Sequence, residues 1–288
     1  MTNLKWTIGE VEVHQIVELE AGQIIKDTIK NATPKNIRDI GWLYPNFADE
    51  AGNLKALVQG FLIKSDNKNI LIDTCNGNDK VRIDIPEWGN LQTDFLKKLR
   101  VIGVTEMDVN VVACTHLHFD HVGWNTKFEG GVWLPTFPNA KYLFVREEYE
   151  YWEQKPAKEI ADDKAAFDDS VDPIVKAGLA ELIDMEYKID RHISFIPTPG
   201  HTPYHVSVFI ESQNQRAIIS GDFLHHPCQV AKPQWTTDTD TQPEKGIVTR
   251  QRILAEIADT DVLLIGSHFA NPVAGRVVQV SDGFIFKV

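Results

Sequence analysis

The chain contains 288 residues, 43% of them hydrophobic, and its 41 acidic side chains outnumber its 29 basic ones, giving a formal net charge of −12. This acidic balance, without any basic stripe, argues against nucleic acid as a partner because the phosphate backbone would be repelled. The apolar stretches are too short to span a membrane, so no membrane partner is expected. We expect a single domain over residues 1–288, since α/β folds with two sheets reach this length.

The cysteines and the N-terminus indicate the cellular compartment. Cys75, Cys114 and Cys228 are widely spaced and include no Cys-x-x-Cys pair. This spacing favours reduced thiols over a disulfide framework or a sulfur-only zinc site. The first residues enter an alternating pattern directly, without the apolar core of a signal peptide. We therefore expect a cytoplasmic protein.

The chain begins with a strand and continues into an irregular arm. Residues 11–17 alternate apolar and polar side chains, which predicts a half-buried strand. Residues 21–56 have no such period, and they contain prolines, glycines and a concentration of aromatic side chains around Trp42. This segment is too aromatic for a solvated linker, so we interpret it as an arm or flap that packs on another surface.

A hairpin and a buried strand follow the arm. The apolar runs 57–63 and 69–73 predict a hairpin whose second strand is deeply buried and ends at Asp73. Residues 91–99 have helical spacing, and 109–114 form a continuous apolar strand. The loop after that strand therefore lies at a strand end, where α/β sheets commonly place ligands.

That loop carries the most informative motif of the chain. Four side chains able to bind metal occur within six residues: His116, His118, Asp120 and His121. Imidazole and carboxylate groups suit zinc, iron or manganese, and four of them this close cannot all reach one tetrahedral ion without backbone strain. The motif therefore predicts two adjacent metal sites.

The second half of the chain repeats this arrangement. Strand 141–145 precedes two charged, helix-forming stretches, 146–154 and 156–180. Beyond them, strands are predicted at 193–197, 206–210, 217–220 and 262–266, and they lead into Gly200-His201, Gly221-Asp222 and Ser267-His268. Ligands supplied by several strand ends would each have rigid support.

These motifs, in this order, resemble those of the metallo-β-lactamase-fold hydrolase superfamily. The resemblance covers nearly the whole chain and implies an αβ/βα four-layer sandwich, with two mixed sheets face to face and helices outside. It implies one metal on His116, His118 and His201, a second on Asp120, His121 and His268, and Asp222 bridging both. Asp73 is then expected to orient a ligand imidazole from behind.

The resemblance also implies a chemistry and narrows the class of substrate. A dinuclear site of this kind would attack a lactone or carboxylic ester with a metal-bridging hydroxide, and it would also suit activated phosphotriesters. Asp222 stands where many true β-lactamases of this fold carry Cys or Ser, which disfavours antibiotic hydrolysis. The pattern is most similar to the lactonase and methyl-parathion-hydrolase-like members. Two divalent ions are expected as cofactors, zinc first, with iron and manganese as alternatives.

Two roles are expected for side chains that contact the substrate. Asp120 would orient the attacking hydroxide besides ligating metal. His225 stands where acyl-homoserine-lactone lactonases carry Tyr, and its imidazole could protonate a leaving alkoxide; a solvated histidine is the alternative. A solvated histidine is likewise the alternative for His226.

Aromatic residues flank the metal motif in the predicted loops. We expect an apolar or aromatic small-molecule substrate to contact Trp42, Phe47, Trp124 and Trp133, together with His226. The competing interpretation is a homodimer interface formed by the N-terminal arm. The alternative function is a mononuclear iron oxidoreductase of the same fold, of the persulfide dioxygenase type.

Overall fold

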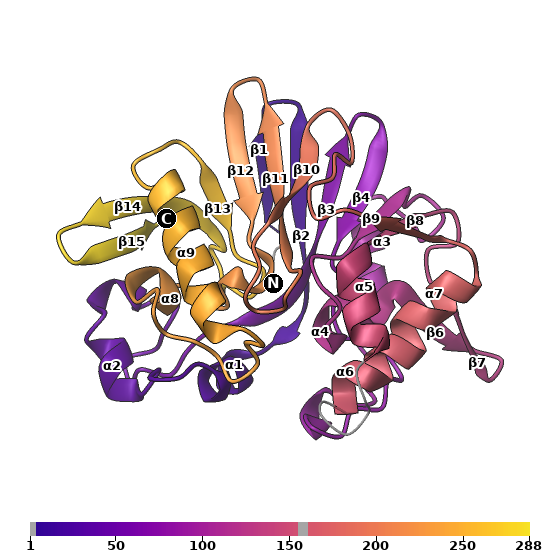
Figure 1. Cartoon of the computed structure of the whole chain (residues 1–288), viewed down its shortest axis with the longest axis horizontal. Coiled ribbons are helices and arrows are strands. Elements are labelled where there is room, and N and C mark those ends of the chain that lie inside the picture. Colours follow the sequence, from indigo (N-terminus) through magenta and orange to yellow (C-terminus); the bar gives the residue numbers. More distant parts are fainter. Residues whose placement is uncertain (1–3, 155–160) are drawn as a thin grey trace. The chain divides into compact units, whose positions relative to one another are not determined.

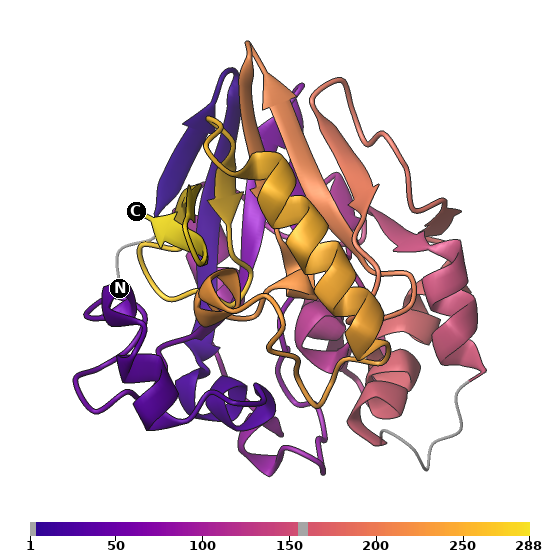
Figure 2. The ribbon, with the colours of Figure 1, turned by 60° about the vertical axis from the view of Figure 1, so that its left-hand side comes forward.

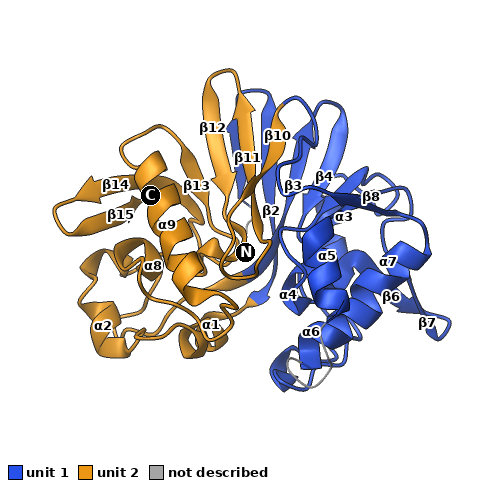
Figure 3. Ribbon diagram, viewed as in Figure 1, with its two compact units in different colours: residues 1–19, 58–191 blue, residues 20–57, 192–288 orange. Residues whose placement is uncertain are grey.

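The computed structural model describes residues 4–154 and 161–288, which form two compact units (Figure 3). Unit 1 comprises residues 1–19 and 58–191, and unit 2 comprises residues 20–57 and 192–288. The arm predicted at 21–56 therefore belongs to the same unit as the C-terminal third of the chain. Whether the whole chain behaves as one domain stays a prediction.

Unit 1 is built on a mixed sheet of seven strands in the order β1-β2-β3-β4-β5-β8-β9 (Figure 1). Its strands are β1 (Lys5–Ile8), β2 (Val11–Glu20), β3 (Leu57–Ser65), β4 (Lys68–Ile72), β5 (Val111–Ala113), β8 (Lys141–Val145) and β9 (Ala180–Ile183). β3 and β4 pair antiparallel, whereas β4, β5, β8 and β9 run parallel. β5 is buried throughout, as expected of a central parallel strand covered on both faces.

The helices of unit 1 follow the parallel strands. They are α3 (Phe95–Val101), α4 (Phe119–Val122), α5 (Arg146–Glu153), α6 (Ala161–Ala166), the π-helix η4 (Phe167–Val171) and α7 (Asp172–Lys176), with 3-10 turns η2 (Pro86–Trp88) and η3 (Gly123–Asn125). α5 packs on β8 and β9, and α6 packs on α4. A separate hairpin, β6 (Thr126–Glu129) and β7 (Val132–Pro135), was not predicted.

The helix predictions in unit 1 are confirmed with shifted bounds. The helix predicted at 91–99 begins at Phe95, and the helix predicted at 146–154 is α5. The stretch predicted as helical at 156–180 contains three short helices and ends as β9 begins at Ala180. Residues 156–160 of that stretch lie outside the described residues.

Unit 2 contains a mixed sheet of six strands in the order β10-β11-β12-β13-β14-β15. Its strands are β10 (Ile193–Pro197), β11 (Val206–Ser212), β12 (Gln215–Ile219), β13 (Leu263–Ile265), β14 (Ala274–Val280) and β15 (Gly283–Lys287). The β12 and β13 pair is parallel and the others are antiparallel. The hairpin β14-β15 extends this sheet beyond the strands that were predicted.

The helices of unit 2 come from both ends of the chain. They are α1 (Gly22–Thr28), α2 (Pro34–Arg38), α8 (Cys228–Ala231) and α9 (Pro243–Ile257), with 3-10 turns η1 (Gly41–Leu43) and η5 (Gly221–Phe223). α9 packs against β14 and runs along this sheet (Figure 2). α8 packs on β15.

The predicted α/β class is confirmed, because each unit combines a mixed sheet with helices. Every predicted metal ligand lies in a loop or short helical turn beyond a strand end. Among the described residues, no helix is long and apolar enough to cross a membrane.

Candidate metal centre

The loop after β5 brings together three histidines of the His-x-His-x-Asp-His motif. The ring centroids of His116 and His118 lie 4.5 Å apart, and those of His116 and His121 lie 4.1 Å apart. All three rings are buried. Asp120 lies in the first turn of α4, and its Oδ1 is 3.7 Å from Nε2 of His121. The motif thus forms one compact donor group within unit 1.

A buried carboxylate, Asp73, lies behind this donor group. Its Oδ2 is 2.9 Å from Nδ1 of His121 and accepts a hydrogen bond from the Thr115 hydroxyl at 2.9 Å. Because that hydroxyl gives its proton to Asp73, its oxygen can accept from Nδ1 of His116, which is 3.0 Å away. Asp73 therefore orients one imidazole directly and a second through Thr115, with Nε2 of each ring left to ligate.

Two helices hold the backbone of the same loop. Glu148 in α5 accepts from the backbone N–H of Leu117 at 3.4 Å, and Asp163 in α6 accepts from that of Phe119 at 3.2 Å. The Trp152 indole donates to Glu148 at 2.7 Å, and its ring lies 5.2 Å from that of His118. Buried carboxylates thus fix the loop on both sides of His118.

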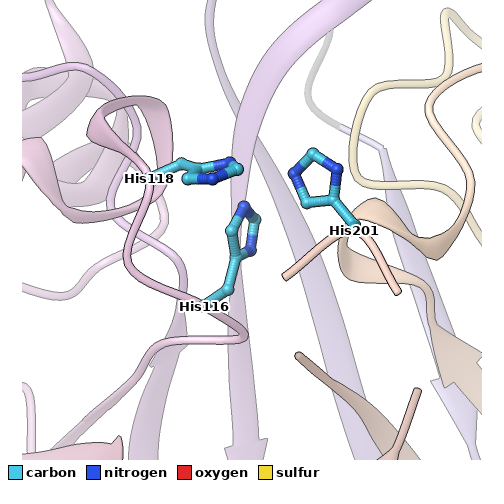
Figure 4. A group of neighbouring side chains, drawn as sticks. All are labelled: His116, His118 and His201. Carbon is cyan, nitrogen blue, oxygen red and sulfur yellow. The ribbon is translucent and has the colours of Figure 1, made fainter. Parts of the chain in front are cut away.

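Unit 2 gathers a second donor group. Asp222, in η5, lies at its centre: its carboxylate is 3.6 Å from Nε2 of His201, 3.1 Å from Nε2 of His225 and 3.2 Å from Nε2 of His268. The ligand atoms of His201, Asp222 and His225 all lie within 4.8 Å of one another. His201 follows β10 and His268 follows β13, so separate strand ends supply this group. Figure 4 draws His201 together with His116 and His118 of the loop after β5.

The predicted ligand histidines of unit 2 are also oriented by partners at Nδ1. Nδ1 of His201 is 3.0 Å from Oδ1 of Asp240, and Nδ1 of His268 donates to the Leu57 carbonyl at 2.8 Å. Burial alone would raise the pKa of Asp240, but the neighbouring His201, His225 and Arg250 hold that pKa below its usual range. Asp240 therefore stays ionised behind His201.

A further buried histidine positions Asp222 through the main chain. Nε2 of His205 accepts from the backbone N–H of Asp222 at 2.8 Å. Its Nδ1 is 2.8 Å from the Thr198 hydroxyl and 3.1 Å from the Thr198 carbonyl. A nitrogen that accepts leaves the other to donate, so His205 is a neutral imidazole.

His225 differs from the other histidines of unit 2. Its ring stacks on that of His268 at 5.9 Å, and its buried Nδ1 has no hydrogen-bond partner among the described residues. Burial lowers the pKa of His225, although the Asp222 carboxylate acts in the opposite direction. His225 is therefore a neutral imidazole beside Asp222, and its Nδ1 is the available ring nitrogen.

The donor chemistry of the two groups fits divalent metal ions. Four of the predicted ligand imidazoles have Nδ1 within 3.0 Å of an oxygen atom: His116, His121, His201 and His268. Such partners fix the tautomer and the ring orientation of metal-binding histidines. Mixed nitrogen and oxygen donors suit zinc, iron and manganese alike.

The residues predicted to wall a substrate pocket have varied surroundings. Phe47 is buried, and its ring packs against Phe269 and Phe286. Nε2 of His226 donates to the Phe47 carbonyl at 2.9 Å, and its Nδ1 accepts from the Cys228 N–H at 3.1 Å. His226 thus attaches the arm through Nε2 and bonds to the start of α8 through Nδ1, and its role towards a substrate stays a prediction.

The three tryptophans of the prediction have different neighbours. Trp124 stacks on Phe95 and donates to the buried carboxylate of Glu18 at 2.6 Å. Trp133 lies in β7 under the Lys80 ammonium, 3.5 Å from the ring centroid. Trp42 lines an open pocket of about 490 Å³ in unit 2, together with Trp235 of the loop after α8. Their contacts with a substrate stay a prediction.

The outer partners of the ligands include residues that carry no sequence signal. Asp240 and Glu148 occur in ordinary polar stretches, with no motif or spacing that relates them to the histidines they hold. Thr115 and His205 belong to no predicted site, and their hydrogen bonds to ligand residues emerge only in the fold. Asp73 is the exception, because it ends a buried strand.

Fold and donor groups together define a metal-binding α/β protein. A model of the metallo-beta-lactamase superfamily matches residues 57–268. The chain belongs to this superfamily.

Curated relatives match part of the chain. The chain is 26% identical over 123 residues to the N-acyl homoserine lactonase AiiA of Bacillus thuringiensis subsp. kurstaki, covering 42% of this chain and 40% of that protein. It is 25% identical over 177 residues to the N-acyl homoserine lactonase AttM of Rhizobium radiobacter, covering 55% of this chain and 61% of that protein. The matched segments thus span less than two thirds of these relatives.

Solved structures match over almost the full length. The dizinc quorum-quenching lactonase AidC has a TM-score of 0.78 at 22% identity, covering 99% of this chain and 96% of that one. The hydrolase AbOPH, of the β-lactamase superfamily, has a TM-score of 0.81 at 20% identity, covering 99% and 97%. These similarities confirm the predicted metallo-β-lactamase fold.

Proposed function

We propose that this protein is a dinuclear metal-dependent hydrolase that opens lactones, with carboxylic esters and activated phosphotriesters as further substrates. The superfamily pattern assigns His116, His118 and His201 to one ion and Asp120, His121 and His268 to the other, with Asp222 between them. Zinc is the first expectation for both ions.

One observation carries the proposal: the Nδ1 atoms of His116, His121, His201 and His268 are all engaged by oxygen atoms. His205 also has an oxygen atom at Nδ1, but its Nε2 accepts from the Asp222 backbone N–H, which distinguishes it from these four rings. Holding Nδ1 directs Nε2 of every ring towards a ligand, which is the arrangement found around protein-bound metals. It also supports the metal expectation independently of sequence similarity.

The chemistry follows from the charges and proton carriers of the chain. Bound divalent ions would lower the pKa of water to about 7 and polarise an ester carbonyl. Asp120 would accept a hydrogen bond from the attacking water and orient it. His225 would exchange a proton through Nδ1 with the substrate. Hydrolysis adds the water oxygen to the carbonyl carbon, breaks the ring C–O bond and leaves the proton on the departing oxygen.

The choice of lactones rests on the relatives. AiiA and AttM are N-acyl homoserine lactonases, and AidC is a lactonase with a fold similar to that of this chain. Their identities of 22–26% support the substrate class and not a particular acyl chain. An apolar acyl or aryl group would suit the aromatic side chains of the arm.

Metal analysis combined with a substrate panel tests the proposal. Protein of known metal content is assayed against lactones, carboxylic esters, thioesters and phosphotriesters, and we expect about two zinc ions per chain with the highest kcat/KM on a lactone. Asp222→Ala should lose metal and activity together. One iron per chain with no hydrolysis would contradict the proposal and favour an iron oxidoreductase of this fold.

A further inference from the structure

Arg250 is an internal cation in helix α9. Its side chain is only 1% exposed, so it has been removed almost completely from water. A guanidinium carries five N–H donors and stays charged in proteins, and burying it without partners is costly. The acceptors that it uses therefore indicate what it contributes to the fold.

The acceptors of Arg250 all belong to the segment between β12 and α9. Its Nε donates to the Phe223 carbonyl at 2.8 Å, and Nη1 donates to the carbonyls of Pro233 at 2.8 Å and Trp235 at 3.0 Å. Its Nη2 lies 3.9 Å from Oδ2 of Asp240. One side chain thus holds the start, the middle and the end of a segment that has little regular structure of its own.

Each of these contacts leads to a residue of the donor group in unit 2. Phe223 directly follows Asp222 in the chain, so fixing its carbonyl fixes the backbone beside that carboxylate. Asp240 holds the ring of His201 through Nδ1 at 3.0 Å. Its other oxygen accepts from the Thr237 N–H at 3.0 Å, which sets the orientation of the carboxylate.

The third connection passes through Gln229. Its side-chain N–H donates to the Trp235 carbonyl at 3.0 Å, where Arg250 also donates, and its oxygen accepts from the His225 N–H at 2.8 Å. Arg250 is therefore linked to His225 by three hydrogen bonds in series, through the Trp235 carbonyl and the Gln229 side chain. Asp222, His201 and His225 depend on the same buried cation.

Helix α9 is itself fixed against the loop that carries His201. The backbone N–H groups of Thr241 and Gln242 donate to the carbonyls of His201 and Gly200 at 2.8 and 2.9 Å. Gly200, with φ +143°, approaches Gly246 so closely that an added Cβ would lie 2.2 Å from the Gly246 Cα. Gly246 and Arg250 are four residues apart and share one face of the helix.

We infer that Arg250 and Asp240 are positioning residues that hold His201 and Asp222 in place to bind metal and that hold His225 beside them. This inference rests on the proposed metal-binding function. Arg250 acts on the backbone of the segment that carries Asp222, and Asp240 acts on the His201 ring. Removing Asp240 should weaken the ion site that includes His201, and removing Arg250 should weaken the ion sites that share Asp222.

The test compares Asp240→Asn, Arg250→Lys and Arg250→Met with the matched control Arg252→Met. Arg252 lies on the same helix, but its side chain is 48% exposed and pairs with Glu256. Stepwise zinc affinities are measured by competition with a chromophoric chelator, and Co²⁺ absorption spectra report the ligand geometry. Unfolding midpoints of the metal-free variants report stability separately.

We expect Asp240→Asn to weaken one zinc affinity by about 10–100-fold, as loss of an outer partner does elsewhere. Arg250→Lys keeps the charge and loses the forked geometry, so we expect zinc affinity to fall by about tenfold and the Co²⁺ spectrum to change. Arg252→Met should change neither. If Arg250→Met fails to fold, Asp240→Asn and Arg250→Lys still test the inference.

Two outcomes would overturn the inference, and they are distinguishable. Wild-type zinc affinities and Co²⁺ spectra in Asp240→Asn and Arg250→Lys, with only a lowered unfolding midpoint, would show a purely structural role and leave the proposed function standing. A wild-type protein that binds no divalent metal would overturn the proposed function as well.

Discussion

Asp73 and His121 lie 48 residues apart in the chain, yet Oδ2 of the carboxylate is 2.9 Å from Nδ1 of the ring. Both side chains are buried, and the same carboxylate accepts from the backbone N–H of Thr115 at 2.8 Å. An acceptor with so many bonds to one loop holds the ring in a single tautomer and orientation.

Replacing Asp73 by Asn should therefore weaken metal binding. The amide keeps an oxygen acceptor but removes the charge that makes the imidazole a stronger ligand, so we expect zinc affinity to fall by about 10–100-fold. Chelator competition measures this change. Asp66→Asn is the control, because Asp66 lies in the β3-β4 turn and pairs with the exposed Arg191. Equal zinc affinity in Asp73→Asn and Asp66→Asn would exclude the orienting role.

Replacing His225 separates catalysis from metal binding. If its Nδ1 exchanges a proton with substrate, His225→Gln should lower kcat by about 10²–10⁴-fold while zinc content stays unchanged. The ratio of zinc to protein and the steady-state kinetics are measured on the same preparation. Loss of one zinc ion would instead identify His225 as a ligand. Zinc content is measured because Nε2 of His225 lies 3.1 Å from the Asp222 carboxylate.

The buried His226 should make stability depend on pH. Burial lowers the pKa of His226 to about 4, whereas an unfolded histidine titrates near 6.5. Between these values the unfolded chain binds the extra proton, so the free energy of unfolding falls as the pH drops from 6.5 towards 4. The full effect of this shift is about 3 kcal/mol. It is present at pH 7 and lost on acidification.

Comparing His226→Gln with the wild type at several pH values isolates this contribution, since all other groups are common to both. Urea unfolding of the metal-free proteins gives the free energies. The wild type should lose stability more steeply with acidification than the variant. Parallel curves for the two proteins would show that His226 does not titrate in this way.

Asp169 should stabilise unit 1 through two buried cations. Its carboxylate lies 2.8 Å from Nη1 of Arg82 and 3.3 Å from Nζ of Lys80, and both cationic side chains are almost fully buried. Asp169→Ala leaves them without their counter-ion, which typically costs about 3–5 kcal/mol. Equilibrium denaturation measures the loss.

The neighbouring Asp168 provides the matched control. Its side chain is 61% exposed and pairs with Lys164 on the same face of the helix. Because exposed ion pairs contribute little, Asp168→Ala should change the free energy of unfolding by less than about 1 kcal/mol. Similar values for both variants would rule out a special contribution from the Arg82 and Lys80 pair.

The strands that carry the donor groups could be predicted because their sequence signal is local. β8 and β10 have the predicted bounds, and β5 lies within the predicted apolar run, since buried strands are short and continuous in hydrophobicity. The hairpins β6-β7 and β14-β15 were missed. β6 and β7 are largely exposed and show weak alternation, and exposed edge strands depend on cross-strand pairing more than on their own residues.

The sequence by itself determined the identity of the candidate ligands, because His-x-His-x-Asp-His and the later His and Asp residues are chemical patterns readable one residue at a time. Only the tertiary structure decided what orients them. Asp240 contacts His201, which is 39 residues away in the chain, and Glu148 accepts from the backbone of Leu117, which is 31 residues away. Arg250 donates to backbone carbonyls, which are chemically the same at every position of the chain. A backbone acceptor or a lone carboxylate carries no sequence signal of its partner, because the partner is selected by packing.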